Sequence, residues 1–381
     1  MEVSQLLNYY PKYVYLDNLI STTGAKVVNI FVDLKGCMQS VYQEWAVKYI
    51  IDQSRGIHVD DSLFASSIEF LSFHKSYARK RDITIRIFFF FERGFSTYHG
   101  GILKSYKDNR KQASFFGLDD ASRDLFFSVL NKNYEVIHKV CNKIPGVWSI
   151  WLDHLEADFV PWHLRRHVLG PPNPDEIDII YSLDKDMLQC LNNDFTFQFY
   201  RHYKSHKMLS RKTALRHYFK SDWPHDDIGV EYFPLFLAID GDMGDGFDGV
   251  KGVSLTGIKS LAPKIVESLR FDNIKDLMTA ARKGEHIFRS DFGTNNKKLL
   301  KIIESENIII RNLKLCSFEI LSDVVNGGYP LNMIQTQKLL SESASSEGKI
   351  TNGAVLYSAL QKIGMTSSLS EQSIFNVFNE G

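Results

Sequence analysis

Short apolar segments recur through the first half of the chain, separated by longer segments of helix-like composition. They are rich in β-branched and aromatic residues and cover positions 27–34 (VVNIFVDL), 83–91 (ITIRIFFFF), 147–152 (VWSIWL) and 177–183 (IDIIYSL). This alternation is typical of βαβ units. The sequence therefore predicts an α/β fold with a mostly parallel central sheet flanked on both faces by helices.

The alternation fades after about residue 235, where helical patterns take over. A segment rich in Gly and Asp at 239–253 (IDGDMGDGFDGVKGV) leads into these patterns. We therefore expect an α/β core over residues 1–235 and a helical region with a C-terminal extension over residues 236–381. Between about 93 and 125, glycines and mixed polarity predict a long excursion over the core.

An acidic residue closes or follows each predicted strand. These residues are Asp33, Glu92, Glu156, Asp158, Asp184 and Asp186. Any one of them alone is more typical of a solvated or capping acid. Open parallel sheets bind ligands at the carboxyl ends of their strands, so we expect the set to share one cleft. Carboxylates that share a cleft repel one another unless a cation compensates them, and Mg²⁺ or Mn²⁺ prefers such oxygen ligands. The pattern suits phosphodiester cleavage with two metal ions about 3.5–4 Å apart.

Composition narrows the possibilities less than the acidic pattern does. The 381 residues include 45 Lys and Arg and 45 Asp and Glu, so the net charge is zero and favours neither nucleic acid nor membrane as a partner. The longest apolar runs fall short of the roughly 20 residues of a membrane-spanning helix, and the N-terminus lacks a signal-peptide pattern. We therefore expect a soluble, cytoplasmic protein. The four cysteines are widely separated, which favours free thiols over disulfides or a zinc site.

Six motifs, in order, resemble the flap endonuclease and 5′-3′ exonuclease family, whose core has a PIN-like nuclease fold. They are FVDLKG at 31–36, FFFERG at 89–94, ILKSYKDNRK at 102–111, LEAD at 155–158, YSLDKDML at 181–188 and GDMGDGFDGVKGV at 241–253. The EAD, S-x-DKD and GD-xx-D motifs are the most specific, and the resemblance covers about residues 27–270. It implies a helical arch at about 93–125 and a helix-hairpin-helix-type region at about 239–270.

The resemblance also implies a set of metal ligands. Eight acids match the residues that hold two divalent metals in the family: Asp33, Glu92, Glu156 and Asp158 nearer one ion, and Asp184, Asp186, Asp242 and Asp245 completing the second. Two positions depart from the family pattern. Phe159 replaces the second Asp of EADD and removes one carboxylate, whereas Glu92 stands where the family usually has Asp. The remaining acids Asp240 and Asp248 fall outside the pattern, and we expect them to be turn acids.

Basic residues of the arch segment are candidates for phosphate binding. Lys104, Lys107 and Arg110, with Lys111, recur at helical spacing. A basic helical face seen alone is usually just solvated. Above a carboxylate cluster, however, such cations can draw the scissile phosphate toward the metals. Nearby, Phe95 and Tyr98 are able to stack on bases, although packing within the arch is the favoured interpretation.

Two further elements are predicted to contact a duplex. In the glycine hairpin, Gly249, Lys251 and Gly252 would approach phosphates and the resemblance implies a K⁺ site, although Ser254 and Thr256 replace a common Gly and Lys. The segment at 201–220 carries seven Lys and Arg residues, including Arg211 and Lys212, and no acid. Taken alone, the composition of this segment is typical of a solvated helix or loop. Its histidines, His202, His206 and His217, are expected to be surface residues.

The resemblance implies a 5′ nuclease that hydrolyses DNA by a two-metal mechanism. The implied substrates are duplexes with a free 5′ end or flap, or RNA:DNA hybrids, as in primer removal. We expect a monomer that acts in DNA replication and repair, with replication proteins as partners, in the cytoplasm of a bacterium or a phage-infected host. Two alternatives stay open: a catalytically impaired DNA-binding protein on the same scaffold, and an RNA-cleaving relative. Steeply salt-dependent DNA affinity is expected despite the neutral net charge.

Overall fold

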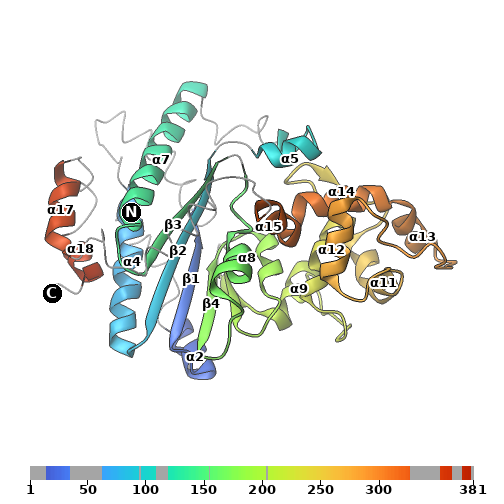
Figure 1. Cartoon of the computed structure of the whole chain (residues 1–381), viewed down its shortest axis with the longest axis horizontal. Coiled ribbons are helices and arrows are strands. Elements are labelled where there is room, and N and C mark those ends of the chain that lie inside the picture. The colour runs from blue at the N-terminus through green and yellow to red at the C-terminus, as the bar shows by residue number, and fades with distance from the viewer. Residues whose placement is uncertain are drawn as a thin grey trace.

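A six-stranded sheet forms the centre of the protein, with the strand order β3-β2-β1-β4-β5-β6 (Figure 1). The computed structural model describes residues 14–34, 62–93, 96–108, 119–153, 155–202, 205–326, 352–362 and 371–378. The strands are β1 (Val27–Asp33), β2 (Thr84–Arg93), β3 (Val147–Asp153), β4 (Glu176–Tyr181), β5 (Thr196–His202) and β6 (Ser205–Leu209). The first five are parallel and β6 is antiparallel to β5. The predicted α/β fold with a mostly parallel sheet is confirmed.

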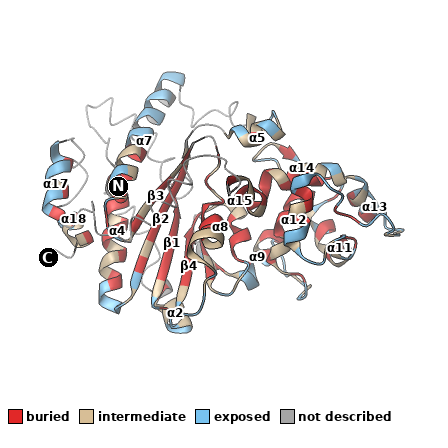
Figure 2. Ribbon diagram, in the orientation of Figure 1, coloured by how far each residue is buried: buried red, intermediate tan, exposed pale blue. Residues whose placement is uncertain are grey.

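Both faces of the sheet are covered by apolar side chains. Ile30 and Val32 of β1 lie in one hydrophobic cluster, which includes residues of the helices α4 (Ser62–Arg81) and α7 (Asp120–Cys141). Phe31 belongs to a second cluster, on the opposite face, with residues from α8 (Val160–Leu164) and α15 (Phe318–Asn326). Figure 2 shows the strands as the most continuously buried part of the protein. Burial on both faces is the reason why the strands read as uninterrupted apolar runs.

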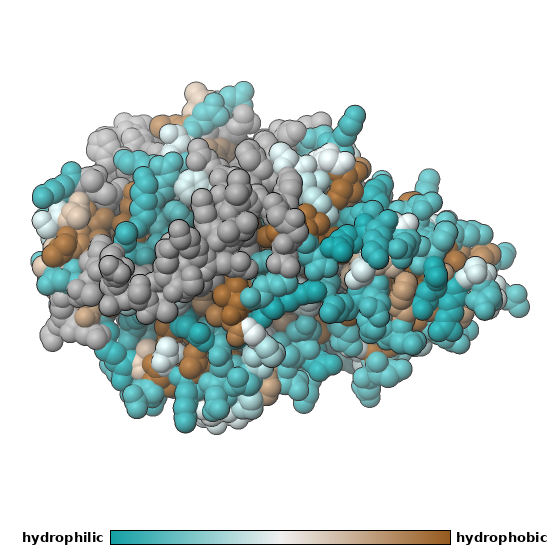
Figure 3. Space-filling view, in the orientation of Figure 1, coloured by the Kyte–Doolittle hydropathy of each residue, from teal (hydrophilic) through white to brown (hydrophobic). Residues whose placement is uncertain are grey.

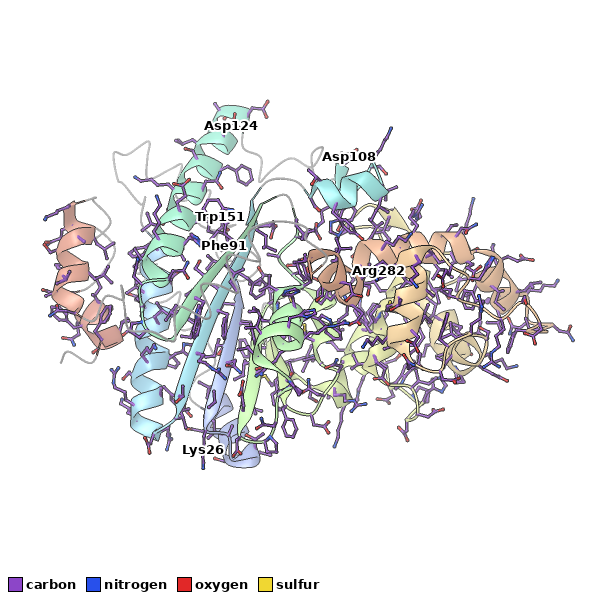
Figure 4. All side chains as sticks on the ribbon, in the orientation of Figure 1. Lys26, Phe91, Asp108, Asp124, Trp151 and Arg282 are labelled. Atoms are coloured by element: carbon purple, nitrogen blue, oxygen red, sulfur yellow. The ribbon has the colours of Figure 1, made fainter. Side chains whose placement is uncertain are left out.

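The order of the strands sets the position of a ligand crevice. The chain passes from β1 through β2 to β3, and then returns to place β4 on the other side of β1. Such a reversal opens a crevice at the carboxyl ends of the two central strands. In Figure 4, Lys26 marks the amino end of β1, whereas Phe91 lies toward the carboxyl end of β2, on the side of Asp108. The strand-end acids therefore lie at the edge of the sheet that faces α5 (Thr97–Ile102).

A second hydrophobic core lies in the helical region. Most of its residues come from α9 (Arg211–Phe219), α10 (Phe233–Asp240), α11 (Leu255–Glu267), α12 (Ile274–Lys283), α13 (Lys297–Glu304) and α14 (Glu306–Cys316). Between α10 and α11 lies a small hairpin of β7 (Gly241–Asp242) and β8 (Phe247–Asp248). The helical segments expected after residue 235 are present. A division at residue 235 stays a prediction.

The basic segment at 201–220 differs from its expected helix or loop. Its first part pairs β5 with β6 in antiparallel register, and its second part forms α9. Met208 packs against the first hydrophobic cluster and the consecutive Leu209 is buried in the second, so apolar contacts on both faces anchor this edge strand despite the many charges. The sequence did not predict β5 or β6.

The C-terminal extension packs on the α/β core rather than on the helical region. Helices α17 (Gly353–Lys362) and α18 (Glu371–Phe378) lie beside α4, at the end of the protein opposite α13 (Figure 1). Ile374 and Val377 join the core cluster, and the Arg79 guanidinium donates a hydrogen bond to the Asn376 carbonyl at 2.9 Å. Apolar residues of α18 therefore cover α4, whereas the expected division of the chain into two regions stays a prediction.

Three cysteines have the state that the sequence predicts. Cys141, Cys190 and Cys316 are buried free thiols, and Cys37 lies outside the described residues. Burial raises the pKa of the Cys141 thiol, which disfavours its reactive thiolate. Among the helices that the structure describes, none combines the length and the hydrophobicity that a bilayer span requires.

We predict that the buried His74 destabilises the fold in acid. Burial lowers its pKa to about 4, whereas the unfolded chain protonates this ring near its ordinary value of about 6.5. The unfolded state therefore binds an extra proton as pH falls from 6.5 toward 4, and about 2–3 kcal/mol of stability is lost across that window.

Urea unfolding of wild type and His74→Phe at pH 7.5 and 4.5 measures this loss. The phenyl ring can keep the contact with Phe70, whose ring centroid lies 4.0 Å away. The variant should lose less stability than wild type between the two pH values. Equal losses would contradict the assignment, because other groups contribute alike in both proteins.

Candidate metal and nucleic-acid site

Three acids at the ends of β1 and β4 are connected by a serine. Asp33 is the last residue of β1, and the Ser182 hydroxyl after β4 donates a hydrogen bond to its Oδ2 at 2.8 Å. The same hydroxyl accepts the Asp184 amide at 3.1 Å. Asp184 in turn caps a short 3-10 helix, η2 (Lys185–Cys190), by accepting the Asp186 amide at 2.8 Å. The S-x-DKD motif thus fixes the side chains of two strand ends in one network.

Two further acids come from the hairpin between α10 and α11. Asp242 Oδ1 accepts the Gly244 amide at 2.8 Å, which closes the turn and places Asp245 on the same side. One carboxylate oxygen from each of Asp186, Asp242 and Asp245 lies within 4.8 Å of the others. These half-buried oxygens form a set of the kind that hard divalent cations prefer.

The acids form two adjacent groups that share Asp184. Burial, followed by the charges of Asp184, Asp33, Glu92 and Glu156, raises the pKa of Asp158 well above its ordinary value. Burial likewise raises the pKa of Asp186, with Asp184, Asp245 and Asp242 as its acidic neighbours. The eight acids predicted to bind metal are therefore brought together. Whether each one is a ligand stays a prediction.

Two lysines lie among these carboxylates. Lys107 forms an ion pair with Glu156 and lies 3.7 Å from Asp245 Oδ2. Lys185 pairs with Asp242 and lies 3.4 Å from Asp186 Oδ1. Burial opposes ionisation of Glu156, but the charge and hydrogen bond of Lys107 lower its pKa below the usual value. The site is thus a cluster of mostly half-buried acids that includes two lysine side chains.

Tyr106 joins the two groups of acids. Its hydroxyl is 3.0 Å from Glu156 Oε2 and 3.1 Å from Asp245 Oδ2, and it donates to these oxygens. The ring stacks on His99 with centroids 4.7 Å apart, and His99 Nε2 lies 3.0 Å from the Leu315 carbonyl. A chain of contacts therefore runs from the acids to α14, and it holds the base of the predicted arch against the helical region.

The arch segment differs in part from the expected helix. Residues 103–107 form a turn after α5, and the Lys107 backbone has a φ of 57°. Its amide donates to the Asp245 carbonyl at 2.9 Å, which sets the lysine beside the hairpin. Lys104 is exposed, while Arg110 and Lys111 lie outside the described residues. The helix predicted from the spacing of the cations is absent at residues 103–107, because a hydrogen bond to Asp245 fixes a turn there instead.

Only one of the two aromatic residues predicted for the arch, Tyr98, lies within the described part of the chain. Tyr98 packs against the buried cluster that contains Phe159, and burial raises its pKa to about 12. This packing agrees with the interpretation that the sequence favoured over base stacking. Phe95 lies outside the described residues.

Gly249 has a structural role that the sequence analysis did not foresee. We expected this glycine to let the backbone approach a phosphate. A β-carbon at Gly249 would overlap the Asp240 carbonyl, and one at Gly241, whose φ is 82°, would overlap the Gly249 backbone. The two glycines therefore allow the strands of the hairpin to touch. Gly252, with a φ of 80°, is exposed and stays a candidate for contact with phosphate, as does the exposed Lys251.

Asp240 and Asp248, the two acids outside the motif pattern, have different surroundings. Asp248 is exposed on β8, whereas Asp240 ends α10 and accepts a hydrogen bond from the Tyr218 hydroxyl at 3.1 Å. Phe159 is fully buried and lies edge-on to His163, with centroids 6.0 Å apart. The position that carries a carboxylate in the family pattern therefore belongs to the hydrophobic core here.

Some residues of the site had no role in the sequence analysis. Ser182 and Lys185 lie within the quoted S-x-DKD motif, which was a signal for both. Gln198 donates to the carbonyls of Ser182 and Asp184 at 3.1 and 2.7 Å, and it belongs to a strand that the sequence did not predict. No local pattern identifies such a residue.

Two basic residues of α9, Arg211 and Lys212, lie at its amino end, and Arg216 is exposed in its last turn. Arg211 is 3.9 Å from Glu231, and Lys212 is exposed. His217 is half-buried on the same helix, and burial lowers its pKa. The side chains of His202 and His206 lie outside the described part of the chain. A role for α9 beside a duplex stays a prediction.

Comparison with known proteins relates this arrangement to solved nuclease structures. No protein-family model matches the sequence, and no curated protein matches it at a significant level. The structure is similar to the D15 protein of T5 crystallised with metal ions, with a TM-score of 0.55 and 18% identity over 84% of this chain and 100% of that chain.

Two more structures of the same kind are similar. The bacteriophage T5 D15 flap endonuclease, in a complex with DNA and metal ions, has a TM-score of 0.55 at 18% identity over 83% of this chain and 99% of that chain. A T5 5′-exonuclease with zinc bound gives 0.52 at 18% identity, over 84% and 100% of the two chains. The resemblance expected from the motifs is therefore confirmed as a shared fold.

We predict that Tyr106→Phe destabilises the fold by about 1–2 kcal/mol, because it removes a buried donor between two carboxylates. The phenyl ring can keep the stacking on His99. Urea unfolding in EDTA measures the change. Tyr232→Phe is a matched control, since this half-buried tyrosine has no hydroxyl hydrogen bond among the described residues. Equal effects of the two substitutions would contradict the bridging role.

Proposed function

We propose that the protein is a metal-dependent 5′ nuclease that hydrolyses phosphodiester bonds of DNA. The observation that supports this most is the convergence of eight acids from three strand ends, η2 and the hairpin at the crevice of the sheet. Asp158 and Asp186 are the centres of the two groups, and burial, followed by the charges of their acidic neighbours, raises the pKa of both. The shared fold with T5 nuclease structures supports the same conclusion.

Divalent metal ions fit this set of donors. Half-buried carboxylates that repel one another are stabilised by a hard cation, and the oxygens of Asp186, Asp242 and Asp245 are close enough to share one. Asp33, Glu92, Glu156 and Asp158 would hold a second ion, with Asp184 between the two. When bound, Mg²⁺ or Mn²⁺ supplies an activated water and stabilises the leaving oxygen. A K⁺ ion at the glycine hairpin is part of the proposal.

The residues of this chain would hold the scissile phosphate over the acids. Lys107 contacts Glu156 and Asp245, so its ammonium group lies at the carboxylates rather than in open solvent. A cation in this position attracts phosphate oxygens and offsets charge that develops on them. Tyr106, held by its stacking on His99, fixes Glu156 and Asp245 relative to one another. Lys104, Arg110 and Lys111 would extend the cationic path along the arch.

The proposed substrates are DNA duplexes with a free 5′ end or a 5′ flap, with the RNA of RNA:DNA hybrids as an alternative. One of the similar T5 structures holds DNA and metal ions. Contact with the duplex would come from the hairpin with Lys251 and Gly252, and from α9 with Arg211 and Lys212. A monomer with a core over 1–235 and a DNA-binding region over 236–381, active in replication and repair in a bacterial or phage-infected cytoplasm, completes the proposal.

A DNA-binding protein without catalysis is the second candidate, and Phe159 favours it. This residue is fully buried in an apolar cluster, so no carboxylate is supplied at its position. The neighbouring acids still lie close to one another. The two candidates differ in cleavage but not in binding.

We predict that the protein cleaves a 5′-flap DNA duplex with Mg²⁺ or Mn²⁺ and not in EDTA. Asp184→Asn and Asp242→Asn should lower kcat by a factor of about 100 or more, because both remove charge from the metal site. Asp248→Asn, on the same hairpin but exposed, is the control and should keep wild-type activity. Binding without cleavage in wild type would favour the second candidate, and undiminished cleavage in Asp184→Asn would refute the site assignment.

We also predict that Asp158→Asn unfolds less readily than wild type in EDTA, by about 1 kcal/mol. Its pKa is raised by burial and by four acidic neighbours, so removing the ionisable group relieves repulsion. The same variant should gain less thermal stability than wild type when Mg²⁺ is added. Differential scanning calorimetry with and without Mg²⁺ tests both statements. A variant less stable than wild type in EDTA would contradict the repulsion.

A further inference from the structure

The hairpin that precedes α11 supplies few cations of its own. Lys251 is exposed in the hairpin, but α11 begins with the uncharged residues Leu255, Thr256 and Gly257. The next cation, Lys259, donates a hydrogen bond to the Ser221 hydroxyl at 2.9 Å and so is directed toward α9. A hairpin that binds a polyanion needs cations near its backbone, because charge neutralisation dominates such affinity.

Two lysines of α13 lie beside the hairpin turn and the first turn of α11, which carry few cations of their own. A β-carbon built on the exposed Gly252 would be 3.1 Å from Lys301 Nζ, and one built on Gly257 would be 3.9 Å from Lys298 Nζ. These contacts join two elements that are far apart in the sequence. The cations of α13 therefore stand directly beside the turn and the first turn of α11.

The packing of α13 explains why its lysines face the hairpin side and solvent. Leu299 and Ile302 are buried in the helical core, whereas Lys297, Lys298 and Lys301 are exposed. The Asn296 side chain caps the helix by accepting the amides of Lys298 and Leu299 at 3.0 and 3.1 Å. Hydrophilic residues dominate this end of the protein in the view of Figure 3.

Among the residues that the structure describes, the lysines of the hairpin and of α13 have no acidic partner nearby. Within the described residues, no carboxylate lies within 4.0 Å of the Lys251, Lys298 or Lys301 ammonium group, whereas Lys107 and Lys185 at the acidic site are both ion-paired. Lys301 and Lys298 therefore place positive charge, unpaired within the described part of the chain, beside the exposed Gly252 turn and the first turn of α11, and a bound polyanion would compensate that charge.

We propose that Lys298 and Lys301 of α13, together with Lys251 and the Gly252 turn, form one composite site for the phosphate backbone of double-stranded DNA. The site rests on the proposed function, since it assigns the duplex to a surface of the same enzyme. Its new content is that α13, outside the motifs of the sequence, provides the cations that Thr256 and Gly257 do not. Binding here is independent of base sequence, because lysines contact phosphates as point charges.

The test measures binding of a blunt, fluorescein-labelled DNA duplex by fluorescence anisotropy, in EDTA and over a range of KCl concentrations. The double variant Lys298→Ala/Lys301→Ala should raise Kd by about 10-fold near 0.1 M salt. It should also lower the slope of log K against log salt by about 1 to 2, because each phosphate contact contributes about 0.9. The double variant Lys80→Ala/Lys139→Ala, on exposed lysines of α4 and α7, is matched in charge and should leave the slope unchanged.

The outcomes distinguish this site from the proposed function. An unchanged slope in the α13 variant, or an equal drop in the α4/α7 control, overturns the composite site. Thr256→Lys in the α13 variant should restore part of the affinity, because it places a cation at the first turn of α11, and no gain would count against the site. If wild type binds the duplex but cleaves no flap, the nuclease proposal fails while the binding result still decides this one. Circular dichroism melting confirms that each variant is folded.

Discussion

Repulsion between half-buried carboxylates is the constraint on which the rest of the structure depends. Asp158 and Asp186 each lie among several acids, and both are only partly exposed to the water that would otherwise solvate them. The fold holds these groups by neutral hydrogen bonds and by two internal cations. Ser182 bridges Asp33 and the Asp184 amide, and Tyr106 bridges Glu156 and Asp245. Holding several carboxylates close together costs free energy, and a bound cation would offset that cost.

The helical region acts as the support of the second acidic group. The hairpin that carries Asp242 and Asp245 touches itself through Gly241 and Gly249, where no β-carbon fits. From α14, the Asn312 amide donates to the carbonyls of Ala238 and Asp248 at 2.8 and 2.9 Å. Contacts of this kind fix the hairpin from both sides. A cluster of acids supplied from both hydrophobic cores therefore depends on the packing at their junction.

Most of the strand-end acids were predictable because they follow from local pattern. Apolar runs that end in Asp33 or precede Asp184 identify strands, and the carboxyl ends of parallel strands must meet at one edge of a sheet. The S-x-DKD motif even contained Ser182, although its role required coordinates. Lys107 was named as a cation of the site, but its turn conformation was not predicted, because the bond from its amide to Asp245 is non-local.

The sequence by itself determined the parallel sheet, the acids of the crevice and the helical character of the second half. These features depend on the alternation and the residue types along each segment. The tertiary structure decided which segments pack against one another. Helix α18 packs on α4, and Gln198 of the unpredicted strand β5 donates hydrogen bonds to two carbonyls. Lys298 and Lys301 lie beside the hairpin turn and the first turn of α11. Such pairings join residues far apart in the chain. No local periodicity encodes them, because they are set by how whole elements pack.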